Sequence, residues 1–123
     1  MQKYKVDWLA FSVSFEDDEQ TLDPQLLKIL GYDLAEFDEI PGRFFYNSGA
    51  TYRNYVNVFW NDPEKPWHKN SSRTMTVVFT GQGSTELAEK WDTDWVSIFR
   101  TLKEYGGVNF TRIDLALDDY DET

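Results

Sequence analysis

The residues best suited to chemistry lie in the last predicted strand, which covers residues 110–121. Side chains of a strand point alternately to its two faces. One face of this strand is aliphatic, and the other carries Arg112, Asp114, Ala116 and Asp118. The two carboxylates are separated by about 13 Å along the strand, at the standard rise per residue. Two acids, an arginine and a small spacer on one face favour holding a cation or orienting a phosphate.

A plainer interpretation of the same strand stays open. Acidic faces are common on solvated edge strands, where Arg112 would simply be the ion partner of Asp114 and Asp118. By spacing alone this interpretation is favoured over a metal site. The remaining acids at the end of the strand indicate a solvated tail. Asp7, in the first predicted strand, is either a further carboxylate near the last strand or a charge that protects a strand edge.

Composition fits one domain spanning residues 1–123. The chain is 41% hydrophobic and 17% aromatic, which is enough for a sizeable core, and it contains no cysteine. A disulfide framework and a thiolate metal site are therefore excluded. The N-terminus lacks the long apolar region of a secretory signal, and no run is long enough to span a membrane. We expect a cytoplasmic protein with no membrane partner.

Net charge is −10, from 22 acids and 12 bases, which argues against strong nucleic-acid binding by this chain alone. One basic and aromatic patch surrounds the single histidine, His68, and consists of Trp67, Lys69 and Arg73 with nearby Lys65. Such a patch could stack an unpaired base. An ordinary exposed loop is the commoner explanation.

Hydrophobic periodicity and turn residues predict the elements. Strands are expected at 6–15, 43–47, 52–60, 73–80 and in the final segment, with residues 47–50 as the turn between the second and third. A helix is expected from Pro24 to Gly31, a short helical turn at 34–37, and a helix capped by Ser84 that breaks at 92–94, where Thr93 caps its second half, and ends at Gly106. Gly81-Gln82-Gly83 is a plain strand-to-helix turn or, less commonly, a phosphate cradle.

The order β-α-β-β-β-α-β predicts an α+β fold. We expect an antiparallel sheet of about five strands with two or three helices packed on one face.

Three motifs in order resemble the replication initiation factor family of rolling-circle replication initiators, found in plasmids, filamentous phages and conjugative elements. They are Val6-Asp7-Trp8-Leu9-Ala10-Phe11-Ser12-Val13, Val78-Phe79-Thr80-Gly81-Gln82-Gly83-Ser84 and Thr111-Arg112-Ile113-Asp114-Leu115-Ala116-Leu117-Asp118-Asp119. The second departs from the family pattern, with Thr80 and Ser84 in place of the usual Ser and Cys. The resemblance covers nearly the whole chain, and the last motif is the most specific.

The resemblance implies a fold related to the HUH nucleases, which nick one DNA strand with a tyrosine while a divalent metal polarises the phosphate. A His-x-His metal strand is impossible here, because the chain has one histidine. The resemblance instead implies carboxylate ligands for Mg²⁺ or Mn²⁺, with Asp114 first and Asp118 less securely. No catalytic residue is assigned within the chain, since the family's nucleophilic tyrosine and its basic surface lie beyond residue 123.

The sequence therefore favours the N-terminal piece of a longer replication initiator or relaxase-like protein, with the piece inactive alone. DNA-binding residues are expected at Arg112, Trp67, Lys69 and Arg73. DNA is the expected partner of the full-length protein, and self-association or host replication proteins are further partners left open. The alternatives are a non-catalytic acidic domain that binds a basic protein, and a DNA mimic with carboxylates at phosphate-like spacing.

Overall fold

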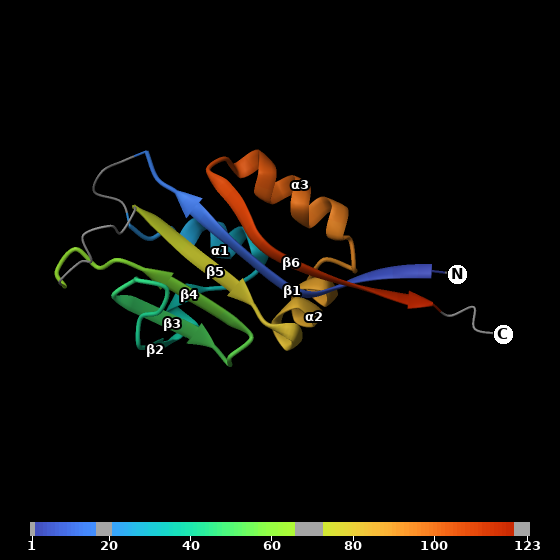
Figure 1. The fold of residues 1–123 in the computed structure, drawn as a ribbon, viewed down its shortest axis with the longest axis horizontal. Helices are drawn as coiled ribbons and strands as arrows, with labels where there is room; N and C mark the ends of the chain where they lie inside the picture. The colour runs from blue at the N-terminus through green and yellow to red at the C-terminus, as the bar shows by residue number, and fades with distance from the viewer. Residues whose placement is uncertain (1, 17–20, 66–72, 120–123) are drawn as a thin grey trace.

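A computed structural model describes residues 2–16, 21–65 and 73–119, with side chains for 5–16, 21–65 and 73–115. Six strands form one sheet in the order β2-β3-β4-β5-β1-β6, and every neighbouring pair is antiparallel. Helices α1, α2 and α3 accompany the sheet (Figure 1). The predicted α+β class is confirmed, with one strand more than expected.

The elements follow one another in this order: β1 Gln2–Ser14, α1 Pro24–Leu30, the 3₁₀ turn η1 Leu34–Glu36, β2 Asp38–Ile40, β3 Ser48–Tyr52, β4 Val56–Trp60, β5 Thr74–Phe79, α2 Gly81–Lys90, α3 Trp95–Tyr105 and β6 Val108–Asp119. None of these helices, within the part of the chain that is described, is long and apolar enough to cross a membrane.

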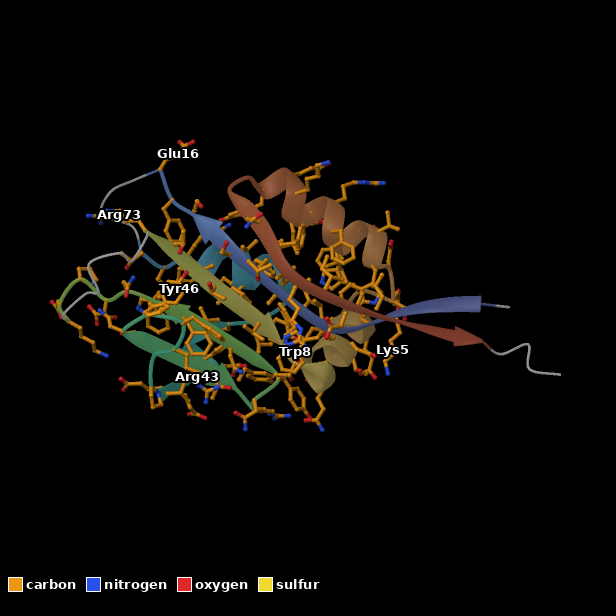
Figure 2. All side chains as sticks on the ribbon, viewed as in Figure 1. Lys5, Trp8, Glu16, Arg43, Tyr46 and Arg73 are labelled. Carbon is orange, nitrogen blue, oxygen red and sulfur yellow. The ribbon has the colours of Figure 1, made fainter. Side chains whose placement is uncertain are left out.

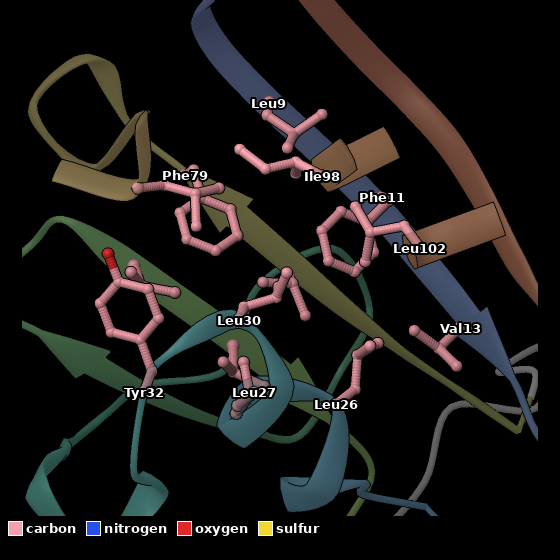
Figure 3. Close-up of a cluster of buried hydrophobic side chains, with 14 of the residues drawn as sticks. Leu9, Phe11, Val13, Leu26, Leu27, Leu30, Tyr32, Phe79, Ile98 and Leu102 are labelled. Atoms are coloured by element: carbon pink, nitrogen blue, oxygen red, sulfur yellow. The ribbon is translucent and has the colours of Figure 1, made fainter. Parts of the chain in front are cut away.

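All three helices contribute to one core on one face of the sheet (Figure 3). Alternate residues of the central strands point into it, and the fully buried large side chains include Leu9 and Phe11 of β1 and Phe79 of β5. Leu26, Leu27 and Leu30 of α1 and Ile98 and Leu102 of α3 cover them. We call this side of the sheet the covered face. It confirms the prediction that the helices pack on one side.

Local signals explain where the helices begin and end. Asp23 caps α1 by accepting from the backbone N–H of Gln25, and Pro24 follows it at the first helical position. Gly31 ends α1 in the left-handed conformation, at φ 104°. The break between α2 and α3 falls where two consecutive residues, Asp92 and Thr93, have positive φ.

Two predicted caps are wrong by a few residues. Thr80, not Ser84, caps α2, and its hydroxyl accepts from the N–H of Gly83. Ser84 is buried inside the helix. Asp94, not Thr93, caps α3, with its carboxylate accepting from both the N–H and the hydroxyl of Ser97. In each case a neighbouring residue offered an equally suitable oxygen.

The predicted hairpin at 43–60 is wrong in register. Residues 43–47 are not a strand. Residues 48–50, which were predicted as part of the turn, belong to β3, and the chain reverses at Arg53 and Asn54. Both have positive φ, 53° and 61°, and the N–H of Tyr55 donates to the carbonyl of Tyr52. That is the tight turn that suits the twist of a hairpin. Asn tolerates this conformation, but the absence of glycine hid the turn in the sequence. The three-residue edge strand β2 was also missed.

Candidate functional site on the open face of the sheet

None of the described helices covers the second face of the sheet, and we call it the open face. Its small apolar cluster joins Ala10, Phe59 and Val78, with Trp8, Ile40 and Tyr46 packed against it. Figure 2 shows Trp8 and Tyr46 on the near side of the sheet, where α1 lies behind the strands. The strand register explains why these residues share the open face. Ala10 is paired with Val78 on β5, and their neighbours along each strand point to the covered face.

A groove of about 390 Å³ crosses the open face over β5, β1 and β6. Its lining is mostly apolar and consists of Trp8, Ala10, Phe44, Thr76, Val78, Thr111 and Arg112. Small-molecule sites in proteins have volumes of roughly 300–1,000 Å³ and combine apolar walls with a few polar groups. The groove has that character, with one hydroxyl from Thr76 on β5 and, from β6, the hydroxyl of Thr111 and the guanidinium of Arg112.

Arg112 is positioned at this groove by two contacts. Its guanidinium carbon lies 4.6 Å from the centre of the Trp8 ring, and its Nη2 and Nε donate to Asp114 Oδ2 at 2.6 and 3.1 Å. A β-bulge at Thr111 precedes it, since Phe110 pairs with Phe11 and Arg112 pairs with Ala10. Bulges re-aim side chains, and this one puts Arg112 on the open face although Phe110, two residues earlier, packs against the core.

Asp114 therefore lies on the open face, opposite Trp8 in the ladder. Its side chain is 44% exposed, and its nearest ion partner is Arg112. The hydrogen bond and charge of that guanidinium lower the pKa of Asp114 and raise the pKa of Arg112. Asp114 is thus an ionised carboxylate beside a fixed cation, which is the arrangement expected by the plainer interpretation of this strand.

The described side chains do not make up a divalent-metal site by themselves. Within residues 5–16, 21–65 and 73–115, no three acidic or histidine side chains come together as metal ligands. Asp114 offers one carboxylate, one of whose oxygens already accepts from Arg112. Asp118 belongs to β6 and pairs with Lys3 in the ladder, but its side chain lies outside the described part. Asp7 is half-exposed and sits 3.9 Å from Lys5 Nζ.

Of the other predicted DNA contacts, Trp67 and Lys69, like His68, lie outside the described residues. Arg73 is exposed and directly precedes β5. It lies at the far end of the open face from Trp8 (Figure 2), because β5 begins beside Ser14 while the groove is formed where β5 passes Ala10. The structure thus brings Arg112 to the groove and leaves Arg73 away from it.

An aromatic loop, residues 43–46, forms one wall of the groove, and sequence reasoning missed it. Phe44 and Phe45 both have positive φ, 57° and 68°, and are 64% and 76% exposed. Phe44 rests edge-to-face on Phe59 at 5.5 Å. Consecutive bulky residues in the left-handed region are strained, and such strain persists where the surroundings impose it, often at functional sites. The signal in the sequence was two adjacent phenylalanines after Pro41-Gly42.

The surroundings of the aromatic loop hold it in place. A Cβ on Gly42 would lie 2.1 Å from the carbonyl oxygen of Tyr46, so the loop closes tightly only with glycine there. Thr76 donates to the Tyr46 hydroxyl at 3.0 Å. Asn47 then ties the loop to the segment that follows β4, since its side chain accepts from the N–H of Asp62 and donates to that residue's carbonyl. Phe44 is therefore presented on a preorganised support.

Gly81-Gln82-Gly83 is explained by packing. A Cβ on Gly83 would lie 1.7 Å from the carbonyl oxygen of Tyr55, so glycine allows α2 to approach the hairpin. The N-terminal turn of α2 is capped by Thr80. Of the two interpretations given for this segment, the structure therefore agrees with a plain strand-to-helix connection and not with a phosphate cradle.

Comparisons with known proteins found no matching family model, no similar curated protein and no similar solved structure.

Proposed function

We propose that this domain is the N-terminal sheet domain of a rolling-circle replication initiator, and that its open face binds unpaired DNA. The observation that carries the proposal is the groove lined by Trp8, Phe44 and Arg112. Aromatic and guanidinium planes stack nucleobases, and each stacked base is worth about 1–3 kcal/mol. The resemblance of three sequence motifs to replication initiation factors supplies the biological setting.

The groove suits a base better than a phosphate chain. Its single cation, Arg112, is half neutralised by Asp114, and the indole of Trp8 already backs the guanidinium. A base entering beside Phe44 would meet an aromatic wall, the Arg112 plane and the hydroxyl of Thr76. These groups favour stacking and one polar contact, which single strands offer and duplexes do not.

The acidic charge of the domain limits how much affinity this face supplies. With a net charge of −10, the chain repels a polyanion, and a phosphate-binding surface must come from elsewhere in the full-length protein. The proposal assigns this domain the positioning of an unpaired base. The proposal takes the nucleophilic tyrosine and a Mg²⁺ or Mn²⁺ ion from the resemblance alone. Asp114 is the metal ligand it suggests, and this carboxylate accepts a hydrogen bond from the arginine of the groove.

Binding of a fluorescein-labelled twelve-residue oligothymidylate, measured by anisotropy at low salt, tests the base groove. Trp8→Ala and Phe44→Ala should each weaken binding by about 5-fold or more, since about 1 kcal/mol or more is lost per stacked base. Ile29→Ala is the matched control, because Ile29 is an exposed aliphatic residue on α1. Equal affinity of all four proteins, or equal affinity for duplex DNA, would remove the groove from DNA binding.

The catalytic part of the proposal needs the full-length protein. Mn²⁺-dependent nicking of single-stranded origin DNA should fall at least about 100-fold in Asp114→Ala if this carboxylate holds the metal that polarises the phosphate. Asp94→Ala, which removes an acid from the cap of α3, serves as the control. Unchanged nicking in Asp114→Ala would exclude Asp114 from the metal site and leave the base groove as a separate question.

A protein-binding function has one observation in its favour. Phe44 and Phe45 are large, exposed and adjacent, as at many protein interfaces. If the oligonucleotide does not bind, a basic protein partner on this face becomes the better explanation. The DNA-mimic alternative has no comparable support among the described residues.

A further inference from the structure

Among the described residues, no strand pairs with the outer edge of β6. This strand spans twelve residues and ends the strand order, with β1 as its neighbour on the other side (Figure 1). The opposite edge strand, β2, has three residues. A long free edge presents a row of unpaired backbone N–H and C=O groups, and proteins normally shorten, cover or pair such an edge.

The same strand carries exposed aliphatic side chains. Ile113 and Leu115 on β6 are 40% and 63% exposed. They are two of the six large apolar side chains exposed in the described part of the chain, the others being Ile29, Phe44, Phe45 and Val96. Exposed aliphatic groups beside an unpaired strand edge favour the addition of a further strand.

We infer that β6 pairs with β6 of a second copy of this chain, antiparallel, across a two-fold axis that passes through Leu115. A two-fold axis normal to the sheet makes such a contact self-complementary, and it keeps the covered faces of both copies on the same side. Residues directly opposite each other in an antiparallel pair point to the same face of the sheet. The two-fold axis must therefore lie where one residue faces its own copy, because an axis midway between two successive residues would pair residues of opposite faces.

Three neighbouring registers are unfavourable. An axis through Asp114 sets this acid against itself, and an axis through Ala116 sets Asp114 against Asp118 in both halves of the pair. Like charges directly opposite each other destabilise a sheet. An axis through Ile113 places the bulged residue Thr111 within the new ladder, and a bulge interrupts pairing.

The axis through Leu115 avoids these conflicts and keeps the regular part of β6, residues 112–118, in one continuous ladder. Arg112 then stands opposite the aspartate at position 118 twice, and Ile113 opposite the leucine at position 117 twice. Leu115 meets its own copy on the axis. Opposite charges and aliphatic pairs at these positions are the combinations that stabilise cross-strand contacts. The complementarity of Arg112 and the acid argues for a second copy as the occupant of the edge.

The absence of cysteine from the chain makes the axis directly testable. In Leu115→Cys the two thiols would lie within about 5 Å of each other, the distance between directly opposed residues of a strand pair. In Ile113→Cys they would lie four positions apart, at about 13 Å by the standard strand rise. Under mild oxidation we expect Leu115→Cys to form a disulfide-linked dimer at least 10-fold faster than Ile113→Cys. Equal rates would overturn the register.

Sedimentation equilibrium of the unmodified chain up to 0.5 mM tests the dimer itself. We expect a dimer, and we expect Leu115→Lys, which places two like charges on the axis, to be monomeric. Ile29→Lys, also an exposed aliphatic residue but on α1, should still dimerise. A monomer at every concentration would overturn the inference, as would dimerisation of Leu115→Lys with wild-type affinity.

Charge reversal distinguishes this contact from the base groove. Arg112→Asp should weaken the dimer at least 10-fold, and Arg112→Asp combined with Asp118→Arg should restore it, since the opposite charges meet again across the axis. A double variant as weak as the single one would contradict the pairing. Leu115 does not line the groove, so loss of the dimer in Leu115→Lys with retained DNA binding, or the reverse, separates the two proposals.

Discussion

The covered and open faces of the sheet are built from alternate residues of the same strands, yet they have different roles. On β1, Leu9 and Phe11 are fully buried, while Trp8 on the other side is partly buried and lies beside Arg112. The covered face gains its helices and excludes water. The open face keeps aromatic rings at a groove. This difference indicates that most of the folding energy comes from the covered face, since the buried cluster of the open face has only Ala10, Phe59 and Val78, and that the groove on the open face is left accessible for binding.

The largest contrast between the faces should appear in stability. Phe11→Ala removes a fully buried ring that contacts Phe79 and Phe110, with centroids 6.4 and 6.2 Å away, and should cost about 3–5 kcal/mol of unfolding free energy. Phe44→Ala on the open face should cost less than about 1 kcal/mol, because Phe44 is mostly exposed. Urea unfolding followed by circular dichroism measures both. Similar losses would mean that the open face also holds the fold together.

Two glycine substitutions in α2 test how tightly the covered face is packed. Gly83→Ala forces a methyl group into the carbonyl of Tyr55 and should destabilise the protein by about 1–3 kcal/mol. Gly81→Ala, two residues earlier, meets only the carbonyl of Asp7 at 3.5 Å and should be neutral or slightly stabilising, as alanine favours a helix. Thermal unfolding compares the two. A destabilising Gly81→Ala would indicate that the first turn of α2 does not accept a methyl group despite the 3.5 Å distance to the carbonyl of Asp7.

On the open face, relief of backbone strain and loss of the ring should oppose each other at Phe45. Phe45→Gly places a residue that accepts the positive φ of 68°, so the loss of stability should stay below about 1 kcal/mol. The loss of an exposed ring from the aromatic loop should weaken oligothymidylate binding. Chemical unfolding and anisotropy on the same preparation give both values. A clear loss of stability would show that Phe45 supports the fold.

The smallest expected effect concerns the ion pair. Because Arg112 lowers the pKa of Asp114, this carboxyl should titrate below its ordinary value in the folded protein, and Arg112→Gln should return it upward. The depressed pKa means that the pair stabilises the fold above the unfolded carboxyl pKa of about 3.9 and loses this contribution as pH falls through the folded value. Carboxyl NMR titration measures it. No shift in Arg112→Gln would mean that the pair does not persist in solution.

Much of the secondary structure was predictable because its signals are local. Strand β1 alternates strongly, Asp23-Pro24 and Gly31 bound α1, and Gly106 follows α3. The hairpin between β3 and β4 was not predictable. Arg53 and Asn54 of its turn have positive φ, which the sequence does not indicate without a glycine. The aromatic residues of 43–47 were predicted as a strand instead.

The candidate site was predictable only in part. Alternation on the last strand put Arg112 and Asp114 on one face, as the structure has them. Their neighbours could not be read from the sequence, because Trp8, Phe44 and Thr76 come from three other segments that meet through the sheet order and the fold of the aromatic loop. The bulge at Thr111 also depends on pairing with β1.

The amino-acid sequence by itself determined the α+β class, the acidic charge, the lack of cysteine and the alternation of Arg112 and Asp114 with aliphatic residues, since these follow from composition and from the two-residue period of a strand. Only the tertiary structure decided which face the helices cover, that β6 is an edge, and that Phe44, Trp8 and Arg112 share a groove. Those features depend on contacts between residues far apart in the chain, which no local pattern specifies.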